Sequence, residues 1–273
     1  TPVLAGTVDG AAAALEAGVV QGGRAAEMTG TSTVLLMGTD GPVVEPRMTM
    51  MHHGISGQFL LLGTMVSTGA SLKWYRDQFG AVERELAAYL GADAFDLLCQ
   101  EAARAPLGSG GVLFLPYMLG ERSPIWDPNA RGVFFGISLA SKRADVVRAI
   151  LEGTAFGLRH NVEVAAEAGV EVRELRSVGG GARSDVWCQV KADVLGVPVL
   201  RMAAALGAPM GDAALVAEAC GLSPTVADYV ERAALVERRF EPDERRHRDY
   251  GEIYPLYREL YDALRGAFGR HAA

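Results

Sequence analysis

The amino-acid sequence predicts an α/β fold in which a mixed sheet carries helices on both faces. The first observation is the order of the second half, where strand-like runs at 172–178 and 198–201 alternate with helix-like runs at 186–195 and 210–220. The second observation is a long amphipathic helix at 144–168, directly ahead of them. Alternating strands and helices are typical of sheets that are covered on both faces.

Turn residues and hydrophobic periodicity divide the first half of the chain. Residues 9–17 are expected to form a short helix, because Asp9 can cap its start and Gly18 follows its end. The elements that follow are expected in this order: strands at 25–29, 34–37 and 57–64, helices at 71–79, 82–90 and 94–105, and a strand at 111–116. The first two of these strands are predicted to form a hairpin.

The remaining segments are a loop, a charged run and a last helix. Residues 119–136 are rich in glycine, proline and charge and are expected to form a long irregular loop, which in compact domains is usually functional. The run at 237–248 is expected to be a solvated surface. A last helix is expected over about 250–268, where Pro255 delays the regular part. Its core-facing stripe is aromatic: Tyr250, Tyr254, Tyr257 and Tyr261.

Composition favours a soluble, cytoplasmic protein. The 273 residues carry a net charge of −7, and 49% of them are hydrophobic, which fits one large or two small globular domains. The acidic balance gives no reason to expect nucleic acid or an anionic membrane as a partner. No stretch reaches the roughly 20 apolar residues of a membrane helix. The cysteines are too few for a disulfide framework and are expected to be reduced, buried thiols: Cys99, Cys188 and Cys220.

The start of the chain reads as an interrupted element. Residues 1–6 have the character of the middle of a strand, with no methionine and no basic leader. We therefore expect the N-terminal part of a longer protein upstream of this chain.

A glycine triplet between a strand and a helix is the strongest local signal. Gly179, Gly180 and Gly181 follow the strand-like run, and Ser184 stands where it can cap the next helix. Glycines allow positive φ angles and let backbone N–H groups approach a flat base or a phosphate without an intervening Cβ. The sequence therefore predicts a backbone-lined nucleotide pocket at this turn.

Three further candidates remain open on the residues alone. The hairpin turn of Gly30, Thr31 and Ser32 could hold a terminal phosphate through its N–H groups and hydroxyls, or it could be an ordinary turn. Asp9 could be a catalytic carboxylate or a plain N-cap. Similarly, Gly69 and the following Lys73 could contact a nucleotide or could mark a helix start with a solvated lysine.

Two spaced segments resemble the second signature of the FGGY carbohydrate kinases. They are residues 132–137, GVFFGI, and residues 145–152, DVVRAILE, which follow after seven residues. Residues 120–128 and the glycine triplet resemble the corresponding segments of xylulokinase-type members. The resemblance extends over residues 3–264 and implies an actin-like (ribonuclease H-like) C-terminal lobe spanning 1–273. Family members hold ATP and sugar between two such lobes, so the resemblance implies that the N-terminal lobe is absent from this chain.

The resemblance also implies roles for individual residues. Asp9 matches the catalytic base that accepts the proton of the sugar hydroxyl, and Gly10 matches a substrate-contacting position. Thr31, with Gly30 and Ser32, corresponds to the hairpin that contacts the ATP phosphates. The matching nucleotide contacts elsewhere are Gly69, Lys73, Gly180, Gly181 and Asp185. Mg²⁺ is implied as the cation that bridges phosphate oxygens, mostly through water. No residue is assigned as a metal ligand, since the adjacent side chains of His52 and His53 would diverge.

Departures from the family pattern concern the substrate more than the fold. Gly10 stands where family members commonly have Gln or Asn. Ala204 and Ala205 replace a usual acidic residue, and residues 207–212 form a less usual version of the following turn. In the long loop, Arg122 and Trp126 could border the sugar site or simply anchor the loop.

The sequence thus predicts an ATP-dependent kinase for a small sugar, with a ketopentose such as xylulose as first choice. Glycerol, erythritol, ribulose and fuculose stay open as substrates, and a homodimer stays open as the assembly. The alternative from another class is an actin-like nucleotide-binding or scaffold module that no longer does chemistry. The isolated 273 residues are expected to have no meaningful turnover, because water would reach the phosphates in half a cleft.

Overall fold

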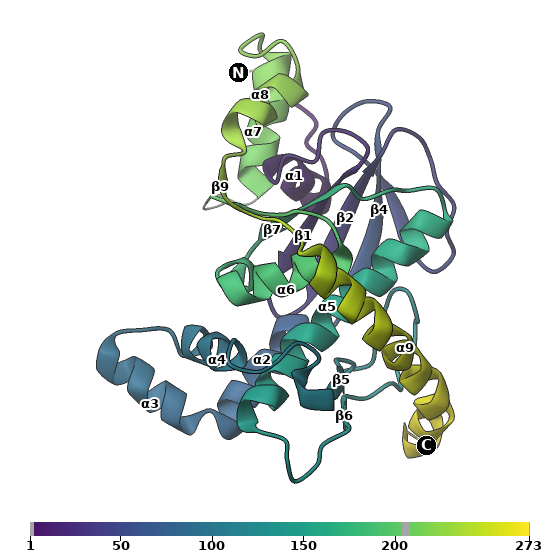
Figure 1. Ribbon diagram of the computed structural model, residues 1–273. Helices are drawn as coiled ribbons and strands as arrows, with labels where there is room; N and C mark the ends of the chain where they lie inside the picture. Colours follow the sequence, from purple (N-terminus) through teal and green to yellow (C-terminus); the bar gives the residue numbers. More distant parts are fainter. Residues whose placement is uncertain (1–2, 204–207, 273) are drawn as a thin grey trace.

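The centre of the molecule is a mixed sheet. The computed structural model describes residues 3–203 and 208–272, so Ala204, Ala205 and Gly207 lie outside the described residues. Within these ranges seven strands pair in the order β3-β4-β2-β1-β7-β8-β9 (Figure 1). They are β1 Arg24–Thr29, β2 Thr33–Thr39, β3 Thr49–His52, β4 Phe59–Met65, β7 Glu174–Val178, β8 Val199–Met202 and β9 Val236–Phe240. β7 pairs in parallel with β1 and with β8, and the other pairs are antiparallel.

The helices follow the expected order with two differences. They are α1 Asp9–Glu16, α2 Thr68–Phe79, α3 Ala81–Leu90, α4 Ala94–Ala102, α5 Arg143–Glu167, α6 Asp185–Leu195, α7 Ala208–Ala219, α8 Val226–Ala233 and α9 Glu244–Ala272. A small antiparallel pair joins β5 Leu113–Leu115 to β6 Val133–Phe135. The amphipathic α8 was not expected, and α9 is longer at both ends than the predicted helix.

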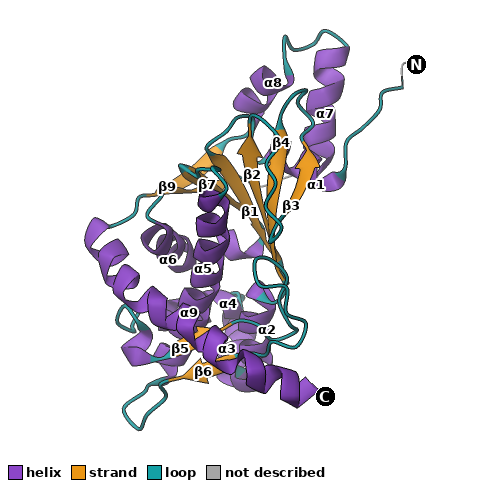
Figure 2. Ribbon diagram, turned by 90° about the vertical axis from the view of Figure 1, so that its right-hand side faces the viewer, coloured by secondary structure: helices purple, strands orange, loops and turns teal. Residues whose placement is uncertain are grey.

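Helices cover both faces of the sheet, as predicted. Side chains alternate along β1, so Ala26 packs against α1 while its neighbour Ala25 packs against Leu158 of α5 and Ala192 of α6. Figure 2 shows α1 and α7 on one side of the sheet and α5 and α6 on the other. Because every interior strand buries both of its faces, the α/β fold class is confirmed.

Helix α5 connects the sheet to a second group of elements. Its first half, including Val147 and Ile150, packs with Leu72 of α2 and Leu98 of α4. Its second half, including Leu158, belongs to the core below the sheet. Helices α2, α3 and α4 and the β5–β6 pair therefore lie beyond one end of the sheet, as Figure 1 shows.

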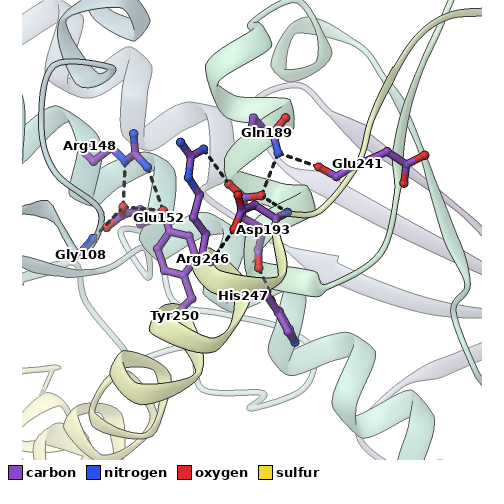
Figure 3. A network of polar contacts seen from close by, with 10 residues as sticks. Gly108, Arg148, Glu152, Gln189, Asp193, Glu241, Arg246, His247 and Tyr250 are labelled. Carbon is purple, nitrogen blue, oxygen red and sulfur yellow. Dashed lines mark hydrogen bonds and ion pairs between the residues drawn. The ribbon is translucent and has the colours of Figure 1, made fainter.

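Helix α9 carries the expected aromatic stripe but does not start late. Its four stripe tyrosines are buried, and Tyr257 bonds to Tyr117 through their hydroxyls at 3.0 Å. The helix begins at Glu244 and continues through Pro255, so the expected delay is wrong. The tyrosines on either side of the proline pack against Phe156, which holds the helix together where one backbone hydrogen bond is missing. Polar contacts fix the start of α9 to α5 and α6 (Figure 3).

Several expectations about loops are corrected by the structure. The expected loop at 119–136 contains β6. The run at 237–248 is mostly exposed, as expected, although it forms most of β9 and the start of α9. Residues 3–8 have no regular structure, although a strand was expected there. Short edge strands such as β3, with exposed side chains, carry little hydrophobic periodicity. Cys99 and Cys188 are buried as expected, whereas Cys220 is exposed. No helix in the described part is long and apolar enough to cross a membrane.

Candidate functional site

A cavity of about 260 Å³ opens where four segments of the chain meet. The segments are the β1–β2 hairpin turn, the first turns of α2, the start of α4, and the glycine turn with the start of α6. The lining includes six of the predicted nucleotide contacts: Gly30, Thr31, Gly69, Lys73, Gly180 and Gly181. The structure therefore brings together backbone turns that lie up to about 150 residues apart, as their numbering shows.

The hairpin turn and the start of α2 are in direct contact. The N–H of Ala70 donates to the carbonyl of Thr31 at 2.9 Å, and a Cβ at Gly69 would lie 2.0 Å from the carbonyl oxygen of Gly30. Only glycine permits this approach. Thus the steric reason for glycine at 69 is the hairpin turn itself.

The first turn of α2 has spare hydrogen-bonding groups. Ser67, at the N-cap position, makes no side-chain capping bond. The hydroxyls of Ser67 and Thr68 are buried and have no partner among the described residues. The start of a helix favours an anionic group nearby, because the helix dipole places positive charge there. Together with the hairpin turn, this end of the cavity fits a phosphate.

The glycine turn uses its glycines in two different ways. Only Gly179 has a positive φ, of 86°, and a Cβ there would lie 2.7 Å from the carbonyl oxygen of Thr29. Gly181 has an ordinary φ, but its Cβ would lie 2.6 Å from Cγ2 of Thr29. At Gly180 the nearest atom would be the carbonyl oxygen of Thr29, 3.9 Å away, so a Cβ there would meet only an ordinary contact. The expected cap is confirmed, since Ser184 Oγ accepts the N–H of Trp187 at 3.2 Å.

The other end of the cavity has apolar walls and carboxylates. Trp187 of α6 is buried and donates through Nε1 to Thr154 at 3.2 Å, which fixes its ring. Phe95 of α4 also lines the cavity and stacks under Arg76, 4.5 Å from the ring centroid. Burial raises the pKa of the Cys99 thiol to about 11, so this wall carries no thiolate at neutral pH. Flat walls of this kind, with Asp96 nearby as an acceptor, suit a heterocyclic base.

The sequence analysis missed these wall residues, although the position of Trp187 could have indicated one of them. Trp187 lies three residues after the cap Ser184, which places it within the first turn of α6, close to the glycine turn. Thr29 directly precedes the hairpin turn and also lines the cavity. Phe95, Asp96 and Cys99 come from α4, and nothing in the sequence links that helix to the glycine turn.

Two predicted residues lie outside this cavity lining. Asp185 lines a separate cavity of about 790 Å³, where its carboxylate pairs with Arg201 at 2.6 Å and with Arg238. Ser32 contributes its carbonyl, which accepts the N–H of Gly30 at 2.9 Å and closes the hairpin turn. Asp185 therefore lies outside the lining of the smaller cavity, although Arg201, which pairs with it, also donates to the carbonyl of Ala182 after the glycines.

Lys73 lies on the rim of the cavity with an exposed side chain. Its ammonium pairs with Asp77, one helical turn further along α2, at 2.6 Å. Hydrogen bonds from Lys73 and Arg76 lower the pKa of Asp77. The lysine therefore offers a positive charge that its neighbour partly neutralises.

Asp9 is exposed and starts α1. Val8 occupies the N-cap position and Asp9 is the first helical residue, one position later than a strict N-cap. One carboxylate oxygen accepts the N–H of the adjacent Gly10 at 2.7 Å. Neither residue lines the cavity. The carboxylate is available to a molecule that approaches the start of α1 from solvent.

The segment 120–128 anchors the end of β4. Glu121 is buried, and one of its oxygens accepts the N–H groups of Val66 and Arg122, each at 2.8 Å. Burial raises the pKa of this carboxyl group to about 7, against the effect of these hydrogen bonds. Trp126 donates to the carbonyl of Arg47 at 2.7 Å, and Arg122 stacks on its ring. These contacts support the anchoring role of the segment; Val66 immediately precedes the first turn of α2.

Comparison with known proteins identifies relatives along the whole chain. The model of the C-terminal domain of the FGGY family of carbohydrate kinases matches residues 25–235. A xylulose kinase of Staphylococcus epidermidis is 33% identical over 95% of this chain and 51% of its own length. A gluconokinase of Bacillus licheniformis is 31% identical over 98% of this chain and 52% of its own length. The chain therefore spans about half the length of the curated relatives it matches.

Solved structures give the same result. The xylulose kinase from Rhodospirillum rubrum superposes with a TM-score of 0.87 at 31% identity, over 98% of this chain and 52% of that chain. The gluconate kinase from Lactobacillus acidophilus superposes with a TM-score of 0.85 at 25% identity, over 96% of this chain and 51% of that chain.

Proposed function

Since the chain belongs to the FGGY family of carbohydrate kinases, we propose that residues 1–273 form the C-terminal, nucleotide-binding lobe of an ATP-dependent sugar kinase. The observation that supports this most strongly is the cavity that joins the hairpin turn, the start of α2 and the glycine turn. The hairpin turn and the start of α2, both suited to phosphate, lie beside a flat-walled recess, an arrangement that suits a nucleotide. The remaining lobe of the same protein is the expected partner, and the cytoplasm, where ATP is available, is the expected location.

The base and the phosphates of the nucleotide are proposed to contact different residues. We place the base against Trp187 and Phe95, and the phosphates at Thr31, Gly69 and Lys73. The described residues contain no group of three or more His, Cys, Asp or Glu side chains placed for a metal ion. Mg²⁺ would then be held mostly by phosphate oxygens and water, and it would neutralise charge on those oxygens.

Asp9 is proposed as the catalytic base. Its exposed carboxylate accepts the proton of a sugar hydroxyl while that oxygen forms a bond to the γ-phosphorus of ATP. The bond from this phosphorus to the β–γ bridging oxygen breaks, and ADP leaves with the electron pair. Phosphoryl transfer needs positioning and charge neutralisation more than covalent chemistry by the protein, so a single carboxylate suffices for the proton.

The substrate is proposed to be xylulose, with gluconate as the second candidate. Both choices rest on relatives named xylulose kinase and gluconokinase. Gly10 offers no side chain to the sugar, so the contacts that select it would come from elsewhere in the protein. The alternative of a non-catalytic nucleotide-binding module keeps the cavity and gives Asp9 no role.

The test measures sugar-dependent ADP release by the protein that contains both lobes. Xylulose, ribulose, gluconate, glycerol, erythritol and fuculose are compared, and xylulose is expected to give the highest kcat/KM. Asp9→Asn is expected to lower kcat at least about a hundredfold while the Kd for ATP changes less than about twofold. Asp262→Asn, an exposed carboxylate on α9, serves as the control. Undiminished turnover in Asp9→Asn would contradict the assignment, and ATP binding without ADP release for any sugar would favour the non-catalytic module.

A further inference from the structure

A buried ion pair lies directly beside the nucleotide cavity. Lys191 of α6 pairs with Glu27 of β1, and both side chains are completely buried, at 0% exposure. Removing two charges from water is costly, and a buried pair often adds no net stability over apolar residues of similar size. The position of the pair therefore calls for an explanation other than stability.

The carboxylate of Glu27 connects three elements of the fold. It accepts hydrogen bonds from Lys191 on α6, from Ser177 on β7 and from Thr29 on its own strand. Lys191 also donates to Ser177 Oγ at 3.3 Å. Glu27 and Ser177 are direct partners in the parallel register of β1 and β7. Every bond of the pair thus holds strand β1, strand β7 or helix α6 in place.

Thr29 links this pair to both turns that line the cavity. Its hydroxyl contacts Glu27 and also Thr33 Oγ1, at 2.7 Å, across the neck of the hairpin. Its carbonyl oxygen and its Cγ2 are the atoms that a Cβ at Gly179 or Gly181 would strike. A Cβ at Gly181 would also lie 3.6 Å from Lys191 Nζ. The glycine turn therefore rests on Thr29 and on the ammonium group of Lys191.

We propose that Glu27, Lys191 and Thr29 are positioning residues that set the separation between the hairpin turn and the glycine turn. This inference rests on the proposed nucleotide site. Lys191 is wholly buried under the glycine turn, so it acts through that turn and does not touch the phosphates. Fixing two binding turns before the ligand arrives lowers the entropy that binding must overcome, so loss of the network weakens nucleotide affinity.

The decisive comparison uses Thr29, because it can lose its hydroxyl without losing its shape. In the protein with both lobes, Thr29→Val is expected to raise the Kd for ADP and the KM for ATP about tenfold, with the KM for sugar unchanged. Thr29→Ser keeps the hydroxyl and is expected to stay within about threefold of the wild type. An equal affinity in Thr29→Val and wild type would overturn the proposal.

A second comparison separates positioning from simple stability. Glu27→Gln with Lys191→Met removes both charges together and is expected to raise the Kd for ADP at least about tenfold. The matched control is Arg148→Met with Glu152→Gln, a buried pair at 2.8 Å that holds α5 to Tyr250 of α9, away from the nucleotide cavity (Figure 3). The control is expected to leave the Kd unchanged.

The outcomes distinguish this proposal from the proposed function. An equal loss of ADP affinity in both double variants would show a general effect of instability and would overturn the positioning role. Wild-type protein without measurable affinity for ATP or ADP would contradict the nucleotide site itself. Wild-type protein that binds ADP, with unchanged affinity in Thr29→Val and in the Glu27 and Lys191 double variant, would overturn the positioning role alone.

Discussion

The cavity proposed to bind the nucleotide and the start of α1 differ in how buried their side chains are and in how they are bonded. The cavity rests on buried groups that bond to one another, such as Thr29 and Trp187, which are 1% and 4% exposed. At the start of α1, Asp9 is exposed and bonds to the backbone of its neighbour Gly10. The difference teaches that the geometry of the proposed nucleotide site is preorganised by the packing of the described residues. The proposed catalytic carboxylate receives no comparable support from the described residues.

This comparison predicts where substitutions act. Changes beside the cavity should alter folding stability and nucleotide affinity together, because the same contacts serve both. Changes at exposed positions should alter function while stability stays constant. Three variants, ordered from the largest expected effect to the smallest, test this division.

The largest effect is expected for Gly69→Ala. The added Cβ would lie 2.0 Å from the carbonyl oxygen of Gly30, and backbone cannot move aside as a flexible side chain can. The start of α2 and the hairpin turn must separate, at a cost of more than about 3 kcal/mol in the free energy of unfolding, because the clash is with backbone. Nucleotide affinity should fall at least about tenfold, because the phosphate end of the cavity is displaced.

Denaturant unfolding and calorimetry with ADP measure the two effects. Gly251→Ala on α9, where no atom lies within 4 Å of the new Cβ, is the control and should stabilise the protein by up to about 1 kcal/mol. Normal stability and affinity in Gly69→Ala would show that the two turns are not held as the structure describes.

Local sequence patterns predicted much of the fold and the turns of the cavity. The hairpin, the long helix and the glycine turn have strong local signals, and their predicted elements are confirmed. The edge strands β3 and β9 were missed because they are short and mostly exposed. The helical path through Pro255 was missed because the aromatic packing that supports it comes from Phe156, about 100 residues away.

The sequence predicted the local turns of the site, but not the contacts between residues that are distant in the sequence. Asp185 follows Ser184 directly, yet successive helix residues point about 100° apart, so Asp185 faces a different cavity. The ion pair of Glu27 and Lys191 joins residues 164 positions apart. The two residues lie in different segments, and no local pattern relates one to the other. The roles assigned to Asp9, Thr31, Gly69 and Lys73 stay predictions until the variants are measured.

An intermediate effect is expected from Glu121, which supports the cavity through Val66. Its pKa is raised from 4.5 to about 7 by burial, so the folded protein keeps this proton after the unfolded chain has lost it. Stability should therefore fall as the pH rises from about 4.5 to 7, by about 3 kcal/mol in total from this group. Glu121→Gln should remove that decrease.

The measurement is the difference in unfolding free energy between wild type and Glu121→Gln at each pH. Burial lowers the pKa of His160 to about 3. As the pH falls below about 6.5, the unfolded chain binds a proton here that the folded protein does not, so the free energy of unfolding decreases. This second effect is common to both proteins and cancels in the difference. A difference that does not change with pH would contradict a raised pKa at Glu121.

The smallest effect is expected at Lys73, which shares one property with the cavity and another with the exposed start of α1. Lys73 lines the cavity, as Gly69 does, but its side chain is exposed, as that of Asp9 is. Lys73→Ala should leave the thermal midpoint unchanged, because exposed ion pairs contribute little, and should weaken ATP binding about threefold to tenfold at low salt. Asp77→Ala frees the lysine from its partner and should strengthen binding slightly. Both differences should shrink in high salt, where exposed charges are screened. Unchanged ATP affinity in Lys73→Ala at low salt would mean that this lysine does not contact the nucleotide, and that the phosphates are held by backbone N–H groups.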